Sequence, residues 1–208
     1  SVKEGKSSTS AGDPQKIKML FPNNFGKPVL TFSKINDDYR LDAPIIVGVI
    51  LSGGQAPGGH NVIAGIFDGI KSAHPDSKLY GFIGGPSGLI DNKFKEITAK
   101  LIDEYRNTGG FDIIGSGRTK LESEEQFEKA RANCEELGIN ALVVIGGDDS
   151  NTNACLLAEY YLATNAQIRV IGCPKTIDGD LKNGQIETSF GFDTACKVYS
   201  ELIGNISR

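Results

Sequence analysis

Two adjacent carboxylates, Asp148 and Asp149, follow the apolar residues 141–145 and a Gly-Gly pair. The β-branched run predicts a buried strand, and the glycines let the backbone turn sharply and approach a ligand closely. In open α/β sheets, ligands collect just past the carboxyl ends of strands. We therefore interpret the two carboxylates as part of a site that faces a positive group. The alternative is a strand-to-helix turn that favours Gly and Asp for conformational reasons alone.

A second acidic loop covers residues 174–180. Asp178 and Asp180 are separated by one residue, so in an extended segment both carboxylates face the same side, with Lys175 and Thr176 nearby. A carboxylate close to a substrate hydroxyl can act as a general base, while a neighbouring cation holds a transferring phosphoryl group. An Asp-Gly-Asp surface turn is the other interpretation of this loop.

Two further loops have compositions that suit phosphate. Residues 52–59 include Gly53 and present small residues and free backbone N–H groups ahead of a predicted helix, a frequent anion site. Their spacing matches neither the P-loop nor the dinucleotide fingerprint. Arg118 follows residues 115–117, and its guanidinium could grip a phosphate in a fork. Glycines that only close a tight turn, and a solvated Arg118 beside Lys120, are the alternatives.

Strands and helices alternate from Pro44 onward. The predicted strands are 45–51, 79–83, 111–114, 141–145 and 168–173; the predicted helices are 60–73, 97–105, 123–137, a helix capped by Asn151 that runs to about 163, and 192–206. Residues 84–88 read as a turn, and Pro174 is expected to break the last strand. This order predicts an α/β, Rossmann-like, mostly parallel sheet with helices on both faces.

The totals exclude several function classes. The formal net charge of −4 argues against a nucleic-acid surface or a basic membrane patch, so any phosphate must be held by local groups. We find neither an apolar stretch long enough to span a membrane nor a secretory signal. The widely spaced Cys134, Cys155, Cys173 and Cys196 read as reduced, buried thiols of a cytoplasmic protein.

Residues 1–43 are predicted to be an extended or disordered N-terminal arm, with 1–14 disordered or loosely held, and residues 44–208 to be one α/β domain. The first residue is not Met, and the chain stops at Arg208 inside an amphipathic pattern. We interpret the chain as a piece of a longer polypeptide.

Three motifs, in this order along the chain, resemble the phosphofructokinase family. They are Ser-Gly-Gly-Gln-Ala-Pro-Gly-Gly-His-Asn at 52–61, Gly-Gly-Asp-Asp-Ser at 146–150 and Pro-Lys-Thr-Ile-Asp-Gly-Asp at 174–180. The resemblance runs from about residue 44 to residue 208 and is to the pyrophosphate-dependent members of the long type. It implies the first, phosphoryl-donor-binding domain of the phosphofructokinase fold, truncated before the sugar-phosphate-binding domain.

The resemblance also implies roles for residues at the donor end of the site. Gly53 would lie against pyrophosphate, Asp148 would bind a bridging Mg²⁺, and Arg118 would reach the phosphoryl donor. The ATP-using relatives have Gly at the positions of Asp149 and Lys175. Asp149 would fill the place of the nucleotide α-phosphate and repel it, and Lys175 would stabilise the transferring group.

At the acceptor end, Thr176, Asp178 and Asp180 would surround the 1-hydroxyl of fructose 6-phosphate, with Asp178 as the proton acceptor. The implied reaction is the reversible transfer of phosphoryl from pyrophosphate to that hydroxyl, giving fructose 1,6-bisphosphate and phosphate in glycolysis or gluconeogenesis. The alternatives are an ATP-dependent enzyme and a non-catalytic regulatory subunit. The residues that hold the sugar 6-phosphate would lie in a missing carboxyl-terminal portion. We therefore expect the 208-residue chain alone to be inactive, and the whole protein to be a homo- or hetero-oligomer.

Overall fold

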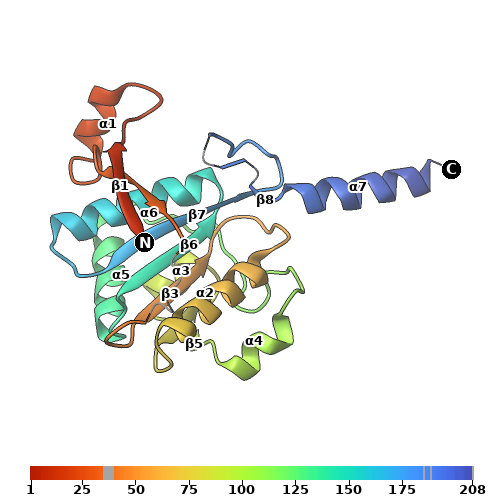
Figure 1. The fold of residues 1–208 in the computed structure, drawn as a ribbon, viewed down its shortest axis with the longest axis horizontal. Helices are drawn as coiled ribbons and strands as arrows, with labels where there is room; N and C mark the ends of the chain where they lie inside the picture. Colours follow the sequence, from red (N-terminus) through yellow and green to blue (C-terminus); the bar gives the residue numbers. More distant parts are fainter. Residues whose placement is uncertain (35–39, 185, 188, 208) are drawn as a thin grey trace.

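The computed structural model describes residues 1–34, 40–184, 186–187 and 189–207. Its centre is a six-stranded sheet in the order β5-β4-β3-β6-β7-β8 (Figure 1). The strands are β3 (Ile46–Leu51), β4 (Lys78–Phe82), β5 (Phe94–Glu96), β6 (Ala141–Gly146), β7 (Arg169–Thr176) and β8 (Phe190–Gly191). Every neighbouring pair is parallel except β4 with β5, so the predicted mostly parallel sheet is confirmed.

Helices cover both faces of the sheet, as predicted (Figure 1). On one face lie α2 (Gly59–Ala73) and α4 (Ala99–Tyr105); on the other lie α3 (Pro86–Ile90), α5 (Glu124–Glu136) and α6 (Asp148–Ala163). Successive strand residues point to opposite faces, so Val49 packs in the cluster of Ile63 and Phe67 from α2. The next residue, Ile50, packs in the cluster of Leu157 from α6. A strand buried on both faces has to be apolar at every position, which explains the unbroken apolar runs.

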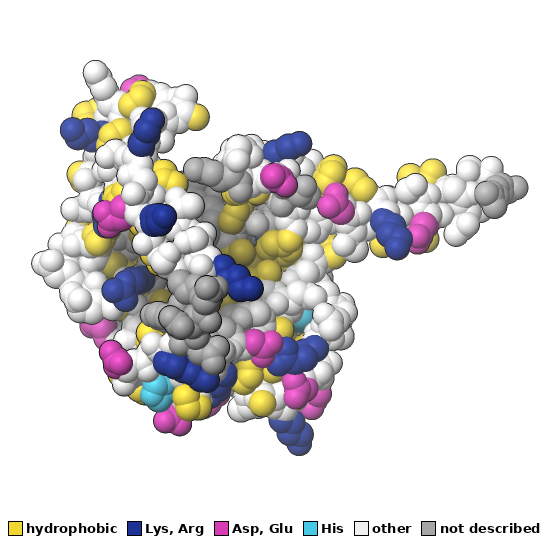
Figure 2. All heavy atoms as spheres, in the orientation of Figure 1, with side chains coloured by type: hydrophobic (Ala, Val, Ile, Leu, Met, Phe, Trp, Pro, Cys, Tyr) yellow, Lys and Arg dark blue, Asp and Glu magenta, His cyan; other side chains and the backbone are white. Residues whose placement is uncertain are grey.

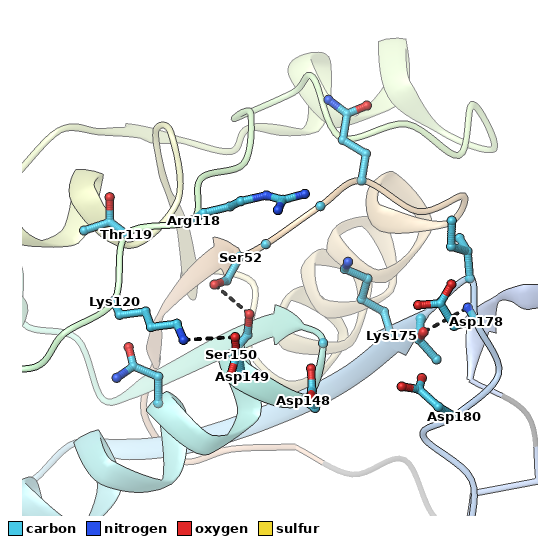
Figure 3. Close-up of a pocket in the computed structure, with 17 residues that line it drawn as sticks. Ser52, Arg118, Thr119, Lys120, Asp148, Asp149, Ser150, Lys175, Asp178 and Asp180 are labelled. Atoms are coloured by element: carbon cyan, nitrogen blue, oxygen red, sulfur yellow. Dashed lines mark hydrogen bonds and ion pairs between the residues drawn. The ribbon is translucent and has the colours of Figure 1, made fainter.

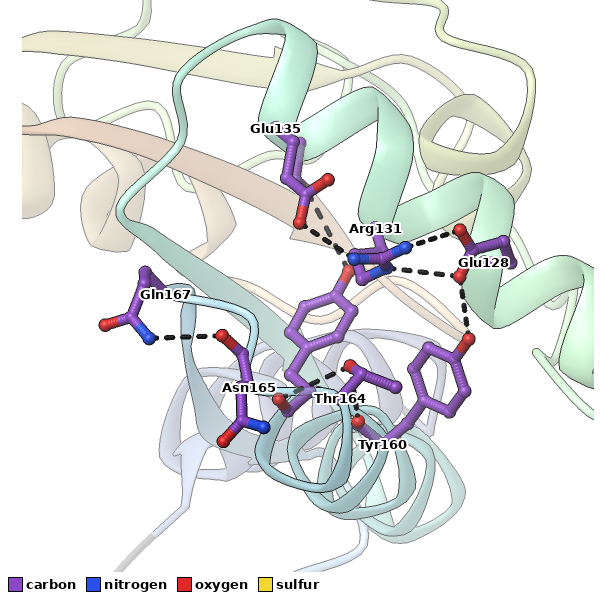
Figure 4. A network of polar contacts seen from close by, with 9 residues as sticks. Glu128, Arg131, Glu135, Tyr160, Thr164, Asn165 and Gln167 are labelled. Carbon is purple, nitrogen blue, oxygen red and sulfur yellow. Dashed lines mark hydrogen bonds and ion pairs between the residues drawn. The ribbon is translucent and has the colours of Figure 1, made fainter.

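A polar network joins the outer sides of α5 and α6 (Figure 4). Arg131 pairs with Glu128 at 2.6 Å and with Glu135 at 3.2 Å, and the Tyr160 hydroxyl from α6 donates to Glu128 at 2.8 Å. The Tyr160 ring also stacks on Phe127, with the centroids 5.4 Å apart. The Arg131 ion pairs lie within α5, and exposed pairs of this kind contribute little individually. The Tyr160 hydrogen bond and ring contact link α5 to the carboxyl-terminal part of α6.

The prediction of a strand at 111–114 is wrong, because these residues form a turn. Phe111, Ile113 and Ile114 are nevertheless buried in the core. Their backbone groups bond to loops and a side chain instead of a strand: the Ile113 N–H donates to His60 Nε2 at 3.1 Å, and the Ile114 carbonyl accepts from the Gly84 N–H at 2.9 Å. The apolar pattern correctly reports burial, but it does not specify how the backbone is hydrogen-bonded.

Pro174 does not break β7, which continues to Thr176. It lies opposite Gly146, the last residue of β6, and pairing with β8 begins only at Lys175. Proline is tolerated there because the pairing of β7 is incomplete on one side. As a result, Lys175 and Thr176 lie on a strand end and not in the loop that the sequence predicted. The short elements α3 and β5 were not predicted, since three to five residues give no clear period.

Where the structure describes it, at residues 1–34 and 40–43, the N-terminal arm contains secondary structure that the sequence did not predict. It contains β1 (Val2–Ser7), α1 (Pro14–Leu20) and β2 (Pro28–Phe32), and β1 and β2 form a separate antiparallel sheet (Figure 1). One link to the body is the Glu159 carboxylate of α6, which accepts the backbone and side-chain N–H groups of Asn23 and Asn24 at 2.5 to 3.0 Å. A second link lies near residue 40, where Arg40 and Leu41 donate to the carbonyls of Ser72 and Ala73. The arm is therefore bound by polar groups while its strand β1 stays exposed.

The predicted final helix is α7 (Phe192–Ile206), which projects away from the sheet (Figure 1). Apolar side chains gather along it with little cover in the space-filling view (Figure 2). Within the part of the chain that the structure describes, no helix is long and apolar enough to cross a membrane.

The four cysteines are free thiols, as predicted, but only Cys134 is buried. Burial raises the pKa of Cys134 to about 12, which keeps it protonated and unreactive at neutral pH. Cys155 and Cys173 are partly buried, and Cys196 is exposed on α7, so the prediction of buried thiols is wrong for Cys196. The reason is that α7 is exposed along most of its length, with Ala195 as its buried residue.

Candidate functional site

One pocket of about 710 Å³ lies at the carboxyl ends of β3, β6 and β7 (Figure 3). Its lining contains every residue that the sequence singled out: Gly53, Arg118, Asp148, Asp149, Lys175, Thr176, Asp178 and Asp180. Three loops that follow β3, β6 and β7 meet here, because parallel strands end at the same edge of a sheet. The fourth loop, with Arg118, follows the turn 111–114 and is held beside Ser52 by an isolated bridge to Gly117.

The two carboxylates at the end of β6 belong to the first turn of α6. This helix begins at Asp148, with Gly147 as its N-cap, so Asp148 and Asp149 lie where the positive end of the helix dipole favours a negative charge. The expectation that Asn151 caps the helix is wrong. Its side-chain amide donates to the carbonyls of Gly146 and Gly147, both at 2.8 Å, and so fixes the turn from inside the first helical turn.

Ser150 joins the loop after β3 to the start of α6. Its hydroxyl donates to Ser52 Oγ at 2.8 Å, and both residues are buried. Only glycine fits at position 146, since a Cβ there would lie 2.5 Å from Ser150 Oγ and 2.7 Å from the Ser52 carbonyl oxygen. This close approach sets the floor of the pocket beside Gly53.

The sequence predicted free backbone N–H groups in the loop 52–59. At three of its positions the N–H group is already hydrogen-bonded within the protein. The N–H of Ser52 donates to the Ile145 carbonyl, and that of Gly53 donates to the Gly117 carbonyl, both at 2.8 Å; that of Gly58 donates to the Gly109 carbonyl at 2.6 Å. These donors are therefore already used within the protein. Close packing requires glycine at position 59, where a Cβ would lie 2.5 Å from the Phe111 ring. The three N–H groups that are already bonded are not available to an anion.

Lys175 is the buried cation of the pocket, with 7% of its surface exposed. No carboxylate in the described ranges lies within ion-pair distance of it, and its ammonium lies 5.9 Å from the centre of the Phe111 ring. Burial, followed by the positive charge of Arg118, lowers its pKa below the usual lysine value, and Asp178 partly opposes this shift. A desolvated cation without a partner attracts an incoming anion strongly.

Arg118 extends across the pocket from a firmly held loop (Figure 3). Gly117 packs so closely against the Gly84 carbonyl that a side chain there would collide with it. Three residues beyond Arg118, the Leu121 backbone is bonded in both directions by the Asn153 amide, at 3.0 and 2.7 Å. Arg118 therefore extends from a segment that is fixed at both ends.

Asp178 and Asp180 are exposed residues that line the pocket at the end opposite Lys120 (Figure 3). The Asp178 N–H donates to Thr176 Oγ1 at 3.0 Å, which ties the loop to the end of β7. Carboxylates that remain in water and face a pocket can accept a proton from a bound hydroxyl group.

The sequence overlooked Lys120 as a site residue. Its ammonium lies 2.9 Å from Asp149 Oδ2 at the mouth of the pocket (Figure 3). The hydrogen bond to Asp149, followed by the attraction of that carboxylate, raises the pKa of Lys120. The sequence does contain a feature that could have identified Lys120. It lies two residues after Arg118, in a loop that the sequence predicts to bind phosphate.

The sequence profile of the phosphofructokinase family matches residues 46–208. The chain belongs to this family. Among curated relatives, it is 64% identical over 205 residues to pyrophosphate--fructose 6-phosphate 1-phosphotransferase of Porphyromonas gingivalis, covering 99% of this chain and 37% of that protein. It is 55% identical to the beta 2 subunit of the Arabidopsis thaliana enzyme, with 98% and 36% covered. The chain thus spans little more than a third of the length of these relatives.

Solved structures share the fold. The phosphofructokinase of Saccharomyces cerevisiae aligns with a TM-score of 0.64 at 24% identity, covering 78% of this chain and 24% of that chain. A pyrophosphate-dependent phosphofructokinase of Nitrosospira multiformis aligns with a TM-score of 0.61 at 21% identity, covering 67% and 35%. The predicted phosphofructokinase fold is therefore confirmed.

Proposed function

We propose that this chain is the phosphoryl-donor half of an enzyme that moves phosphoryl reversibly between pyrophosphate and the 1-hydroxyl of fructose 6-phosphate. The observation that carries the proposal is one pocket in which the buried, unpaired Lys175 lies between Asp148 at one end and Asp178 at the other. The printed names of the relatives support the same substrates. The domain boundary near residue 44 and a cytoplasmic location belong to this proposal.

In the forward direction, Asp178 accepts the proton of the 1-hydroxyl as the oxygen attacks phosphorus. A new C–O–P ester bond forms, the P–O–P bond breaks, and free phosphate leaves. Lys175 lies where it can stabilise the negative charge of the transferring group, and its burial makes that interaction stronger than in water. Arg118 holds the donor, while Thr176 and Asp180 orient the acceptor.

A Mg²⁺ ion fits the donor end of the pocket. Asp148 offers an exposed carboxylate there, although the described residues contain no cluster of three or more His, Cys, Asp or Glu side chains that could hold a metal by themselves. Mg²⁺ in phosphoryl-transfer sites is usually bound through one or two carboxylates together with substrate phosphates. Asp148 would hold the ion, which neutralises charge on pyrophosphate when bound.

The test of the acceptor assignment is Asp178→Asn in the complete protein. The substitution keeps the shape of the side chain and removes the proton acceptor, so kcat should fall by about 10² to 10⁴ with little change in pyrophosphate binding. Steady-state kinetics with both substrates measure the effect, and Asp76→Asn, which lies outside the pocket, is the control. Near-normal turnover of Asp178→Asn would remove Asp178 from the mechanism.

An ATP-using enzyme is the second candidate, and Asp149 counts against it. An unpaired carboxylate about 4 Å from an α-phosphate charge costs roughly 4 kcal/mol at an effective dielectric near 20, or around three orders of magnitude in affinity. The ion pair with Lys120 reduces this charge repulsion, and the volume of the Asp149 side chain remains in the way of the nucleotide. Asp149→Gly should therefore make ATP use measurable while pyrophosphate use falls, and Lys175→Gly should mainly lower the pyrophosphate rate. If Asp149→Gly still does not bind ATP, this carboxylate is not what excludes the nucleotide.

The complete protein should need segments beyond these residues for the sugar 6-phosphate, so we expect the chain alone to be inactive. Mixing it with the remaining portion of the polypeptide tests this expectation by the recovery of phosphotransfer. The relatives named as alpha and beta subunits favour an oligomer. A non-catalytic subunit is disfavoured, because both Asp148 and Asp178 are present.

A further inference from the structure

The ion pair between Lys120 and Asp149 occupies the donor end of the pocket (Figure 3). The side chain of Asp149 is 73% exposed and that of Lys120 is 50% exposed, so neither is held by packing. An exposed pair of this kind adds little to the stability of a protein. Both residues line the pocket that we propose binds the phosphoryl donor, so the pair can act on donor binding.

The backbone places Lys120 next to Asp149. The segment that carries it is fixed at Gly117, whose carbonyl accepts from the Gly53 N–H, and at Leu121, which Asn153 bonds on both sides. Asn153 lies on α6, the same helix that carries Asp149. The two charged groups are therefore brought together by one connected set of hydrogen bonds, which keeps Lys120 at the same pocket wall.

The charges of the pocket show that the binding of pyrophosphate depends on a cation that pairs with Asp149. The lining holds four carboxylates, on Asp148, Asp149, Asp178 and Asp180, and three cations, on Arg118, Lys120 and Lys175. A bare Asp149 would repel the α-phosphate of a nucleotide, but it would also repel pyrophosphate itself, because the repulsion between like charges does not depend on which phosphate carries the charge. A carboxylate that discriminates between the two donors needs its charge cancelled while its volume is kept.

We propose that Lys120 is a positioning residue for Asp149: it neutralises the carboxylate and holds it against the donor end of the pocket. The pair then excludes a nucleotide by occupying the space that its α-phosphate would need, without repelling pyrophosphate. Lys120 acts through Asp149 and not by contact with the donor. This inference rests on the proposed pyrophosphate-dependent function.

The experiment is a double-mutant cycle in the complete protein, with Lys120→Met, Asp149→Asn and both together. Lys120→Met leaves a bare carboxylate, so the KM for pyrophosphate should rise about tenfold while kcat and the KM for fructose 6-phosphate change by less than about twofold. With Asp149→Asn already present, Lys120→Met should have almost no effect, because no charge remains to be neutralised. Lys120→Arg should restore the KM, and added salt should reduce the defect of Lys120→Met, since the groups are exposed.

Lys129→Met is the matched control. Lys129 forms an equally exposed ion pair with Glu125 at 2.8 Å on α5, outside the pocket, and its loss should leave all three kinetic constants unchanged. An unchanged KM for pyrophosphate in Lys120→Met would overturn the inference. So would an equal rise with and without Asp149→Asn, which would show that Lys120 contacts the donor directly. Absence of pyrophosphate-dependent turnover in the unsubstituted protein would instead overturn the proposed function.

Discussion

The helices α2 and α7 are each 15 residues long and amphipathic, yet the apolar face of α2 is buried and that of α7 is exposed. In α2, six residues are buried against the sheet, among them Ile63, Phe67 and Ile70. In α7, only Ala195 is buried, and Tyr199 and Ile203 are 56% and 67% exposed.

The difference shows that an apolar stripe specifies a helix but not the surface that covers it. The stripe of α2 meets the strands β3 and β4, which lie next to it in the sequence. The stripe of α7 follows the last strand, and no element of the described ranges covers this helix, which projects from the body (Figure 1). In proteins, most helical stability comes from packing of the apolar face, so α7 lacks the stabilisation that α2 has.

The largest expected effect tests this contrast directly. Phe67→Ala should destabilise the chain by about 3 to 5 kcal/mol, because it removes a buried ring and leaves a cavity in the cluster around α2. Ile203→Ala in α7 should change the free energy of unfolding by less than about 0.5 kcal/mol. Urea unfolding followed by circular dichroism measures both. Similar losses for the two variants would mean that α7 packs against the body in solution.

A smaller effect concerns association. An uncovered apolar stripe favours contact between molecules, so the chain should self-associate through α7. Leu202→Lys should shift the population towards monomer, whereas Ser200→Lys, off the stripe on the same helix, should not. Sedimentation velocity over a range of concentrations distinguishes the two. Equal behaviour of both variants would place the contact elsewhere, with the exposed N-terminal sheet as the next candidate.

The smallest effect concerns pH and the N-terminal end of α2, where His60 is buried. The buried His60 bonds Thr108 Oγ1 at 2.6 Å and accepts the Ile113 N–H. Burial lowers the pKa of His60 below 6.5, against an opposing effect of Asp112. The unfolded chain therefore binds a proton at higher pH than the folded one, so stability is full above about pH 6.5 and falls as the pH drops through the lowered folded pKa.

His60→Gln should make the unfolding free energy depend less steeply on pH between about 7 and 5. The other histidine supplies the control, and His74→Gln should leave the slope as it is. Thermal unfolding at a series of pH values gives the slopes. An unaltered slope in His60→Gln would assign the acid sensitivity to carboxylates.

The sequence predicted long elements well and short or irregular ones poorly. The ranges of α2, α5, β6 and α7 were predicted to within about two residues, because their periods are clear over many positions. The segment 111–114 has the composition of a buried strand, and only the arrangement of His60 and Gly84 around it decides that it is a turn. Likewise, the end of β7 beyond Pro174 depends on where β6 and β8 stop pairing with it.

For the site, the residue types and their place after strands were enough to select the members of the pocket. Parallel strands deliver their carboxyl ends to one edge, so the loops after β3, β6 and β7, with their Gly, Asp and Lys residues, had to meet there. The loop of Arg118 follows the turn 111–114, and only the contact of Gly117 with Ser52 and Gly53 places it at the pocket. The sequence could not tell that the Gly53 N–H is already used by Gly117, or that Lys175 is buried with no carboxylate of the described residues within ion-pair distance. It also could not pair Lys120 with Asp149, because they lie 29 positions apart in the sequence and the pairing depends on Asn153 holding Leu121 to α6. The local sequence thus determined which groups are available, whereas hydrogen bonds between distant segments decided which of their charges are cancelled and which remain to bind a ligand.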